Sequence, residues 1–223
     1  MDAAFKRKIL LLLLAAPIVL GAALFLPAGT FDYWQAWAYM VVLLVPAAIA
    51  ITYFLGKDPA FLERRLRTRE KETTQSLIVK VGTLIFVIGF LIPGFDHRFG
   101  WSAVPTGMVI AADALVFLGY MFVFLVFREN SYAGRTVQVD KGQKLISTGP
   151  YSIVRHPMYL GQLLLFLATP IALGSYAAVP VFLLLIPIYI FRILNEEEVL
   201  RLGLPGYIQY CKKTRYRLVP FIW

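Results

Sequence analysis

Long apolar runs constrain the fold of this chain more than any other feature of its sequence. A helix needs about 20 apolar residues to cross the hydrocarbon core of a bilayer. Hydrophobic residues make up 59% of the chain and charged residues only 16%, which is typical of polytopic membrane proteins. The candidate spans are residues 9–26, 34–55, 77–93, 104–127, 157–173 and 176–194. The sequence therefore predicts an all-α membrane helix bundle with about six transmembrane helices.

The last two apolar runs are predicted to form a tight helical hairpin, because only Gly174 and Ser175 separate them. The second arm contains Pro180 and Pro187, which would kink a helix in a soluble protein but are tolerated in a membrane bundle. We divide the chain into an N-terminal scaffold of four spans, residues 1–128, and a C-terminal region, residues 129–223. The C-terminal region comprises a polar loop, the hairpin and a tail.

The basic residues predict the orientation of the bundle. Of the 22 Lys and Arg residues, only Arg98 falls on the opposite side of the predicted membrane from the others. By the positive-inside rule, both termini are expected in the cytoplasm. The protein is expected to be a multi-pass protein of a bacterial or archaeal inner membrane. We expect the first apolar run to be an uncleaved helix rather than a secretory signal. The net charge of +9 fits this bias and anionic lipid headgroups, and gives no reason to expect nucleic acid as a partner.

The sequence contains no motif for a metal site, a nucleotide-binding P-loop or a nucleophile elbow. Cys211 is the only cysteine, so an intrachain disulfide is excluded. His97 and His156 fall on opposite predicted sides of the membrane. No zinc spacing, P-loop or nucleophile elbow is present, and no metal site is predicted.

Polar residues cluster directly before the fifth apolar run. Arg155 and His156 precede Pro157, which suits the first turn of a helix because its missing N–H has no partner there anyway. They are therefore expected at the positive end of that helix, where free N–H groups favour an anion. A polar cluster at the mouth of a span costs free energy unless it binds something. The alternative is an interfacial cluster whose Arg and His reach lipid phosphates.

A second polar cluster follows the sixth run. Arg192 and Glu196 are four residues apart and share one helix face. The hairpin returns Arg192 to the same membrane face as Arg155 and His156. An ordinary Arg–Glu pair at the membrane surface is the alternative. The polar loop of residues 128–148 is long enough that we expect it to cover a site rather than only connect helices.

Two features of the scaffold have open interpretations. Asp113 lies inside the fourth span, where it is either a proton or cation site or a hydrogen-bond partner of a neighbouring helix. Residues 58–67 are predicted to form an amphipathic helix that lies on the bilayer surface and binds lipid.

The C-terminal region, residues 130–223, resembles the integral-membrane methyltransferases. That group contains isoprenylcysteine carboxyl methyltransferase and the phospholipid N-methyltransferases. The motifs that resemble the family are Gly149-Pro150-Tyr151, Arg155-His156-Pro157-Met158-Tyr159-Leu160-Gly161, Arg192-Ile193, Glu196-Glu197, Tyr207 and Tyr210.

The resemblance implies S-adenosylmethionine as the methyl donor, bound on the cytoplasmic side beneath the polar loop. It implies that the donor site is lined by Gly149, Pro150, Tyr151, His156, Tyr159 and Gly161, and that Glu196 or Glu197 holds polar groups of the donor. Arg155 and Arg192 match arginines that the carboxyl-methylating branch places at the carboxylate of the substrate, and they are the expected catalytic residues.

The acceptor of the methyl group is predicted from charge. A carboxylate is ionised at neutral pH and needs no general base, whereas an amine would need Glu196, Glu197 or His156 to remove a proton. The guanidinium fork of arginine fits planar oxyanions better than amines. We therefore expect methylation of a lipid or isoprenoid carboxylate within the membrane.

Three alternatives to carboxyl methylation remain open. One is N-methylation of a phospholipid amine. A second is an NADPH-dependent reductase, because the sterol reductases share the Arg-His-Pro element and a similar C-terminal ending. The third is a non-catalytic membrane protein that binds lipid headgroups.

Overall fold

The computed structural model describes residues 3–66 and 73–223. Its elements in chain order are α1 (Ala3–Ala28), α2 (Trp34–Lys57), α3 (Pro59–Arg65), α4 (Thr73–Phe99), α5 (Thr106–Glu129), the 3-10 helix η1 (Gly149–Ser152), α6 (Pro157–Ala172), α7 (Val179–Leu183), α8 (Leu185–Gly203) and α9 (Tyr207–Lys213). No strand occurs within these described ranges. The predicted all-α fold is confirmed.

The long helices form a bundle of membrane dimensions. Five helices are long and apolar enough to span a membrane: α1, α2, the part of α4 from Gln75, α5, and α7 with α8 taken together. The helix α6 is apolar but has only 16 residues, which is short for a span. Of the six expected spans, five are therefore matched by such helices in the part of the chain that is described. The expected span at residues 157–173 corresponds to the shorter apolar helix α6.

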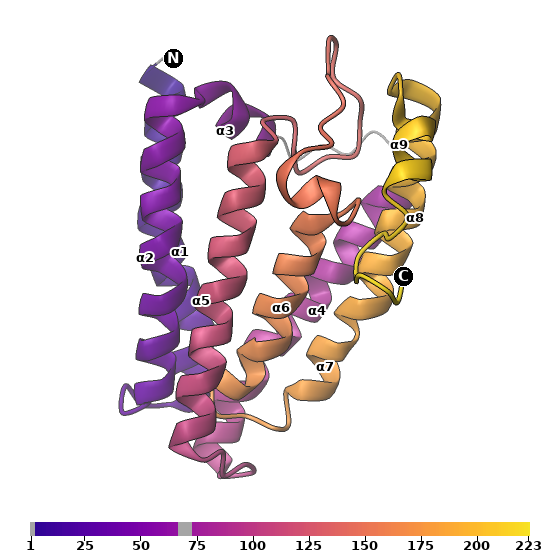
Figure 1. The fold of residues 1–223 in the computed structure, drawn as a ribbon. Helices are drawn as coiled ribbons and strands as arrows, with labels where there is room; N and C mark the ends of the chain where they lie inside the picture. Colours follow the sequence, from indigo (N-terminus) through magenta and orange to yellow (C-terminus); the bar gives the residue numbers. More distant parts are fainter. Residues whose placement is uncertain (1–2, 67–72) are drawn as a thin grey trace.

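The long helices α1, α2, α4, α5 and α6 run in alternating directions, and α7 and α8 together form the arm that returns beside α6 (Figure 1). The N-terminus, α3, the loop between α5 and η1, and α9 lie at one end of the bundle, which we call the loop end. The turns from α1 to α2, α4 to α5 and α6 to α7 lie at the other end. Large apolar side chains such as Ile18 and Leu26, 71% and 77% exposed, cover the outer faces of the helices. Such a surface suits hydrocarbon rather than water.

Glycines allow two pairs of helices to pack closely. A Cβ atom on Gly161 of α6 would lie 2.7 Å from Cγ2 of Val123, and one on Gly119 of α5 would lie 2.9 Å from the carbonyl oxygen of Gly161. A Cβ atom on Gly94 of α4 would lie 2.5 Å from the carbonyl oxygen of Leu24 in α1. Small residues let the backbones of membrane helices approach in this way. The helix α4 is thus packed on α1 at the far end of the bundle, while its first turns lie beside α8 at the loop end.

The predicted helical hairpin is present, with an interruption in its second arm. Gly174, at φ +72°, follows the end of α6. The second arm breaks at Leu184, between α7 and α8. Pro187 lacks the N–H that would bond to the carbonyl of Leu183, which accounts for the break. Beyond it, α8 continues to Gly203, well past the predicted end of the apolar run.

The amphipathic segment at residues 58–67 is described as far as Leu66, and it forms the helix α3 up to Arg65. Phe61 and Leu62 of α3 are buried in a cluster with Ile9 and Phe54. Asp58 caps the helix by accepting a hydrogen bond from the backbone N–H of Phe61 at 2.9 Å. The apolar face of α3 therefore packs on the bundle, and lipid binding by this segment stays a prediction.

The structure provides no partner for one oxygen of Asp113. This side chain is buried in α5, and its Oδ1 atom makes no hydrogen bond with the described residues. The expected hydrogen bond to a neighbouring helix is therefore not seen at this oxygen.

Candidate active site

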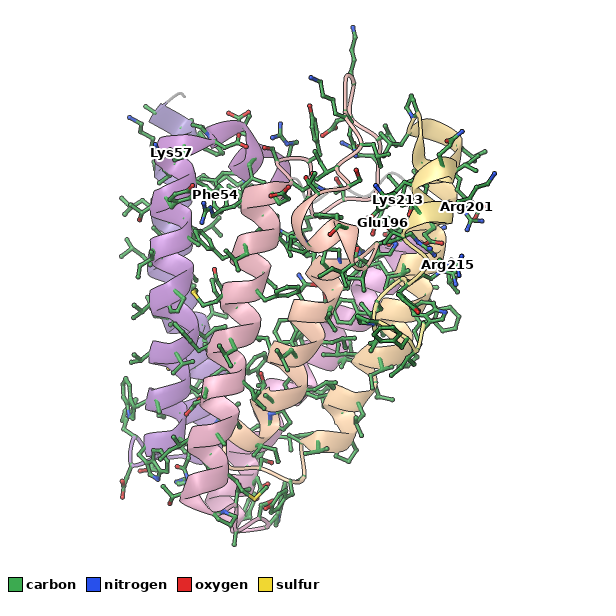
Figure 2. All side chains as sticks on the ribbon, in the orientation of Figure 1. Phe54, Lys57, Glu196, Arg201, Lys213 and Arg215 are labelled. Carbon is green, nitrogen blue, oxygen red and sulfur yellow. The ribbon has the colours of Figure 1, made fainter. Side chains whose placement is uncertain are left out.

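A polar cavity, the loop cavity, lies beneath the long loop at the loop end of the bundle. Its walls come from the loop itself, from the start of α6, from α8 and from α9. Figure 2 shows Glu196 beneath the loop, at the same end of the bundle as Lys57, Arg201 and Lys213. The lining residues are Asn130, residues 132–138, residues 143–146, Tyr151, Arg155, His156, Met158, Tyr159, Arg192, Glu196, Leu200, Leu204, Tyr207 and Tyr210. The long loop therefore covers a cavity, and the expectation that this cavity is a functional site stays a prediction.

Arg192 and Glu196 are connected through a tyrosine of the other hairpin arm. The Tyr159 hydroxyl donates a hydrogen bond to Glu196 Oε2 at 2.6 Å and accepts one from Arg192 Nε at 3.0 Å. Arg192 also donates from Nη1 to Gln75 Oε1 at 3.0 Å, and from Nη2 to the carbonyl of Arg135. One guanidinium therefore joins α4, α6, α8 and the loop, which fixes its position in the cavity wall.

Glu197 lies outside the loop cavity, in a different environment from its neighbour. It is 1% exposed, and its Oε1 accepts a hydrogen bond from Arg155 Nε at 2.6 Å. Its Oε2 accepts from Arg217 Nε at 3.1 Å and from Arg201 Nη2 at 3.3 Å. A buried carboxylate needs such partners to offset its lost hydration. Glu197 is thus the centre of an ion-pair cluster.

The Arg155 guanidinium attaches the C-terminal tail to this cluster. Its Nη1 donates to the carbonyls of Thr214 and Arg215, each at 2.9 Å. The backbone extends the attachment, because the N–H groups of Arg155 and His156 donate to the carbonyls of Tyr216 and Arg217. Arg155 lines the cavity, and these contacts show that it also holds the tail against α8.

Two buried polar atoms in the cavity wall make no hydrogen bond with the described residues. They are Nε2 of His156 and the hydroxyl of Tyr207. The histidine nitrogen lies 3.5 Å from Glu197 Oε1. Burial raises the pKa of Tyr207, and the nearby charge of Glu197 raises it further, so the hydroxyl stays protonated and can donate. A buried polar group without a partner costs free energy, which a bound polar ligand would offset.

Tyr151 and Tyr210 form a fixed aromatic part of the cavity wall. The Tyr210 hydroxyl donates to the Tyr151 carbonyl at 2.6 Å, and the Tyr151 hydroxyl accepts from Asn130 Nδ2 at 3.0 Å. Burial raises the pKa values of both tyrosines, so both rings stay neutral. These contacts connect α9 to η1 and to the end of α5.

A second cavity, the apolar cavity, lies between α4, α6 and α8 and has a volume of about 300 Å³. Most of its lining is hydrocarbon. The lining residues are Arg65, Ile78, Val79, Gly82, Thr83, Phe86, Arg135, Met158, Tyr159, Gln162, Phe166, Leu185, Ile188, Tyr189 and Arg192. Arg135, Met158, Tyr159 and Arg192 line both cavities. The two cavities are therefore adjacent and share one wall.

Comparison with known proteins identifies the segment that contains most of this site. Residues 108–202 match the phospholipid methyltransferase family. The match confirms the resemblance to integral-membrane methyltransferases for this segment and supports a membrane methyltransferase. Members of such families generally use S-adenosylmethionine as methyl donor. This matching segment, residues 108–202, contains the loop, α6 and nearly all of α8. The helices α3 and α4 and the C-terminal tail lie outside it.

One relative of this chain is named as a reductase rather than a methyltransferase. The chain is 32% identical over 108 residues to the Delta(14)-sterol reductase of Mus musculus. The alignment covers 44% of this chain and 25% of the relative. The chain thus matches only about a quarter of that protein.

Six of the expected site residues line the loop cavity, and four do not. Those in the wall are Tyr151, Arg155, His156, Tyr159, Arg192 and Glu196. Outside it are Gly149, Pro150, Gly161 and Glu197. Gly149 has φ +55°, and a Cβ atom there would lie 3.0 Å from Cδ of Glu129, so this glycine permits a turn. Gly161 permits the close packing of α6 on α5.

Several residues of the two cavities were not predicted as site residues. Tyr207 and Tyr210 belong to the motifs that resemble the methyltransferases, but they were not assigned to the site. No sequence pattern indicated Arg65 and Arg135, which line the apolar cavity from α3 and from the loop. The same holds for Gln75, which contacts Arg192 from the start of α4.

Proposed function

We propose that this protein transfers a methyl group from S-adenosylmethionine to the carboxylate of a lipid or isoprenoid held in the membrane. The wall shared by the two cavities is the observation that supports the proposal most directly. An acceptor chain in the apolar cavity would place its headgroup beside the loop cavity, where the donor would bind. The match to phospholipid methyltransferases supports the reaction class.

The polar atoms of the loop cavity fit such a donor. The Tyr207 hydroxyl makes no hydrogen bond with the described residues, so it is available to a polar group of a ligand. His156 Nε2 lies 3.5 Å from Glu197 Oε1. The carboxylate of Glu196 suits a cationic ligand. S-adenosylmethionine, when bound, supplies a methyl carbon made electrophilic by the sulfonium, so the chain needs mainly to orient the acceptor.

Arg192 is the residue we assign to orienting the acceptor carboxylate. It lines both cavities, and Gln75 and Tyr159 hold its guanidinium in place. The carboxylate is already ionised, so no base is required. Correct placement of two reacting groups can be worth about 7–11 kcal/mol of the barrier. Arg155, which holds the tail against α8, acts in this proposal as a positioning residue.

The loop end of the bundle is the cytoplasmic end in this proposal, with both termini on that side. The labelled side chains Lys57, Arg201, Lys213 and Arg215 gather there (Figure 2), as the positive-inside rule requires. The methyl donor would then enter from the cytoplasm, and the acceptor from the bilayer.

A phospholipid amine is the second candidate acceptor, favoured by the name of the matching family. In that case Glu196, which accepts a hydrogen bond from Tyr159, would receive the proton from the amine. The sterol reductase relative suggests a third candidate, in which NADPH would occupy the loop cavity.

A binding assay followed by product analysis separates these candidates. The purified protein is heated with S-adenosylmethionine, S-adenosylhomocysteine or NADPH, and we expect the first two to raise its unfolding temperature. It is then given labelled S-adenosylmethionine with either N-acetyl-S-farnesylcysteine or phosphatidylethanolamine. A base-labile methyl ester supports the proposal, whereas a base-stable N-methyl product contradicts the carboxylate assignment. Stabilisation by NADPH alone contradicts the methyltransferase assignment.

Tyr207→Phe provides a sharp test of the donor site. Removing a buried hydroxyl that lacks a partner should raise the stability of the ligand-free protein, by about 1 kcal/mol. The same change should weaken S-adenosylmethionine binding about tenfold, measured by calorimetry. Tyr176→Phe, at an exposed position on the far end of the bundle, is the matched control and should change neither. If Tyr207→Phe bound S-adenosylmethionine as tightly as the wild-type protein, the assignment of Tyr207 to the donor site would be wrong.

A further inference from the structure

Arg65 is a charged residue of the apolar cavity that comes from outside the phospholipid methyltransferase segment. It is the last residue of α3, and it lines the apolar cavity but not the loop cavity. Its neighbour Arg64 lines neither. Because Phe61 and Leu62 are buried in the bundle, α3 holds Arg65 in the wall of the apolar cavity.

The contacts of Arg65 leave part of its guanidinium available. Nη1 donates to the carbonyl of Gly134 at 2.8 Å and lies 3.6 Å from Met158 Sδ. The guanidinium carbon lies 4.7 Å from the centre of the Phe127 ring. Nε and Nη2 make no hydrogen bond with the described residues. These N–H groups form the planar fork that fits a carboxylate or phosphate.

The charge around Arg65 favours an anion. Arg65, Arg135 and Arg192 all line the apolar cavity, and no Asp or Glu is among its described lining residues. Burial lowers the pKa of Arg65, and the charges of Arg192 and Arg135 act in the same direction. Like charges held together out of water cost free energy that an anionic ligand would offset. The rest of the cavity, with Phe86, Phe166 and Ile188, suits a hydrocarbon chain.

We propose that Arg65 binds the carboxylate of the acceptor lipid and selects it over neutral lipids of the same chain. This inference rests on the proposed function and adds a specificity residue from the N-terminal scaffold. Arg192 faces both cavities, whereas Arg65 faces only the apolar cavity. Loss of Arg65 should therefore weaken binding of the acceptor and spare binding of the donor.

The test compares an acid with its uncharged analogue. Binding of N-acetyl-S-farnesylcysteine and of its carboxamide is measured by calorimetry on the full chain in lipid nanodiscs. In Arg65→Gln we expect affinity for the acid to fall about 10- to 100-fold, as for a lost charge-assisted hydrogen bond. Affinity for the carboxamide and for S-adenosylmethionine should stay within about twofold. Arg65→Lys should retain part of the selectivity, because it keeps the charge without the fork.

Arg64→Gln is the matched control, since Arg64 also holds the loop by donating to the carbonyl of Ser131 at 2.8 Å. It should leave the preference for the acid unchanged. Equal losses for acid and carboxamide in Arg65→Gln, or an acid-specific loss in Arg64→Gln, would overturn the inference. Size-exclusion profiles and unfolding temperatures check the fold, and Arg65→Lys provides the comparison if Arg65→Gln does not fold.

The result is separable from the proposed function because binding needs no methyl transfer. If the wild-type protein forms no methyl ester but its preference for the acid depends on Arg65, only the proposed function fails. If the ester forms and Arg65→Gln still prefers the acid, only the inference fails.

Discussion

Glu196 and Glu197 are adjacent in the sequence, yet their environments differ completely. Consecutive residues of an α-helix point about 100° apart, so Glu196 lines the loop cavity while Glu197 lies in the ion-pair cluster with Arg155, Arg201 and Arg217. The sequence indicated that one or both hold the donor. It could not tell them apart, because the rotation of α8 is set by packing against α4 and α6.

The two glutamates should respond differently to the same substitution. Glu197→Gln leaves the buried Arg155 guanidinium without its charged partner, so we expect a loss of about 3–5 kcal/mol of stability. Glu196→Gln should change stability by less than about 1 kcal/mol and weaken S-adenosylmethionine binding instead. Chemical unfolding in detergent micelles and calorimetry measure the two effects. A Glu197→Gln protein that is as stable as wild type would contradict the structural role of the cluster.

Substitution of the two arginines expected to be catalytic should also have different effects. Arg192→Lys keeps the charge but loses the fork, so ester formation should fall about 100-fold, as on removal of an oriented donor, while donor affinity stays within about threefold. Arg155→Lys should mainly lower the unfolding temperature, because Nε and Nη1 of Arg155 bond to Glu197 and to tail carbonyls. Turnover and unfolding are measured on both variants. If Arg155→Lys lost as much turnover as Arg192→Lys without a loss of stability, Arg155 would be assigned to the acceptor site as well.

At the scale of the elements, the hairpin was predictable and the loop was not. Gly174 and Ser175 mark the turn, and Pro187 accounts for the break after α7. The path of the loop depends instead on contacts between its backbone carbonyls and distant arginines. Arg64 binds the carbonyl of Ser131, Arg65 that of Gly134, and Arg192 that of Arg135. Carbonyl contacts of this kind have no signature in the sequence of the loop.

The packing of α6 on α5 gives an element-scale prediction. In Gly161→Ala the new Cβ atom would lie 2.7 Å from Cγ2 of Val123, so the Val123 side chain or the two helices must shift, at a cost of about 1–3 kcal/mol. Gly107→Ala is the control on α5, where a Cβ atom meets nothing within 4 Å, and it should leave stability unchanged or slightly raise it. Unfolding temperatures of the two variants test this. A stable Gly161→Ala protein would show that α5 and α6 adjust readily.

At the scale of the whole molecule, the apolar runs and basic residues predicted the bundle, but the site crosses the proposed division at residue 128. Arg65, Gln75 and the first turns of α4 belong to the scaffold and yet line or support the two cavities. Arg65 reaches the apolar cavity from α3, whereas Gln75 contacts Arg192 of α8 from the first turn of α4. We therefore now propose that the N-terminal spans complete the acceptor site as well as support it.

The orientation of the bundle determines which compartment supplies each substrate, and labelling can test it. With Cys211 replaced by Ser, a cysteine at Lys141 in the loop should react with a membrane-impermeant maleimide only in inverted vesicles, where the cytoplasmic face is outside. A cysteine at Trp101, exposed at the far end, should react only in right-side-out vesicles. This outcome follows from the asymmetry of the basic residues, since only Arg98 is expected on the outer side. Labelling in the reverse pattern would place the loop cavity outside the cytoplasm, which would contradict a donor supplied from the cytoplasm.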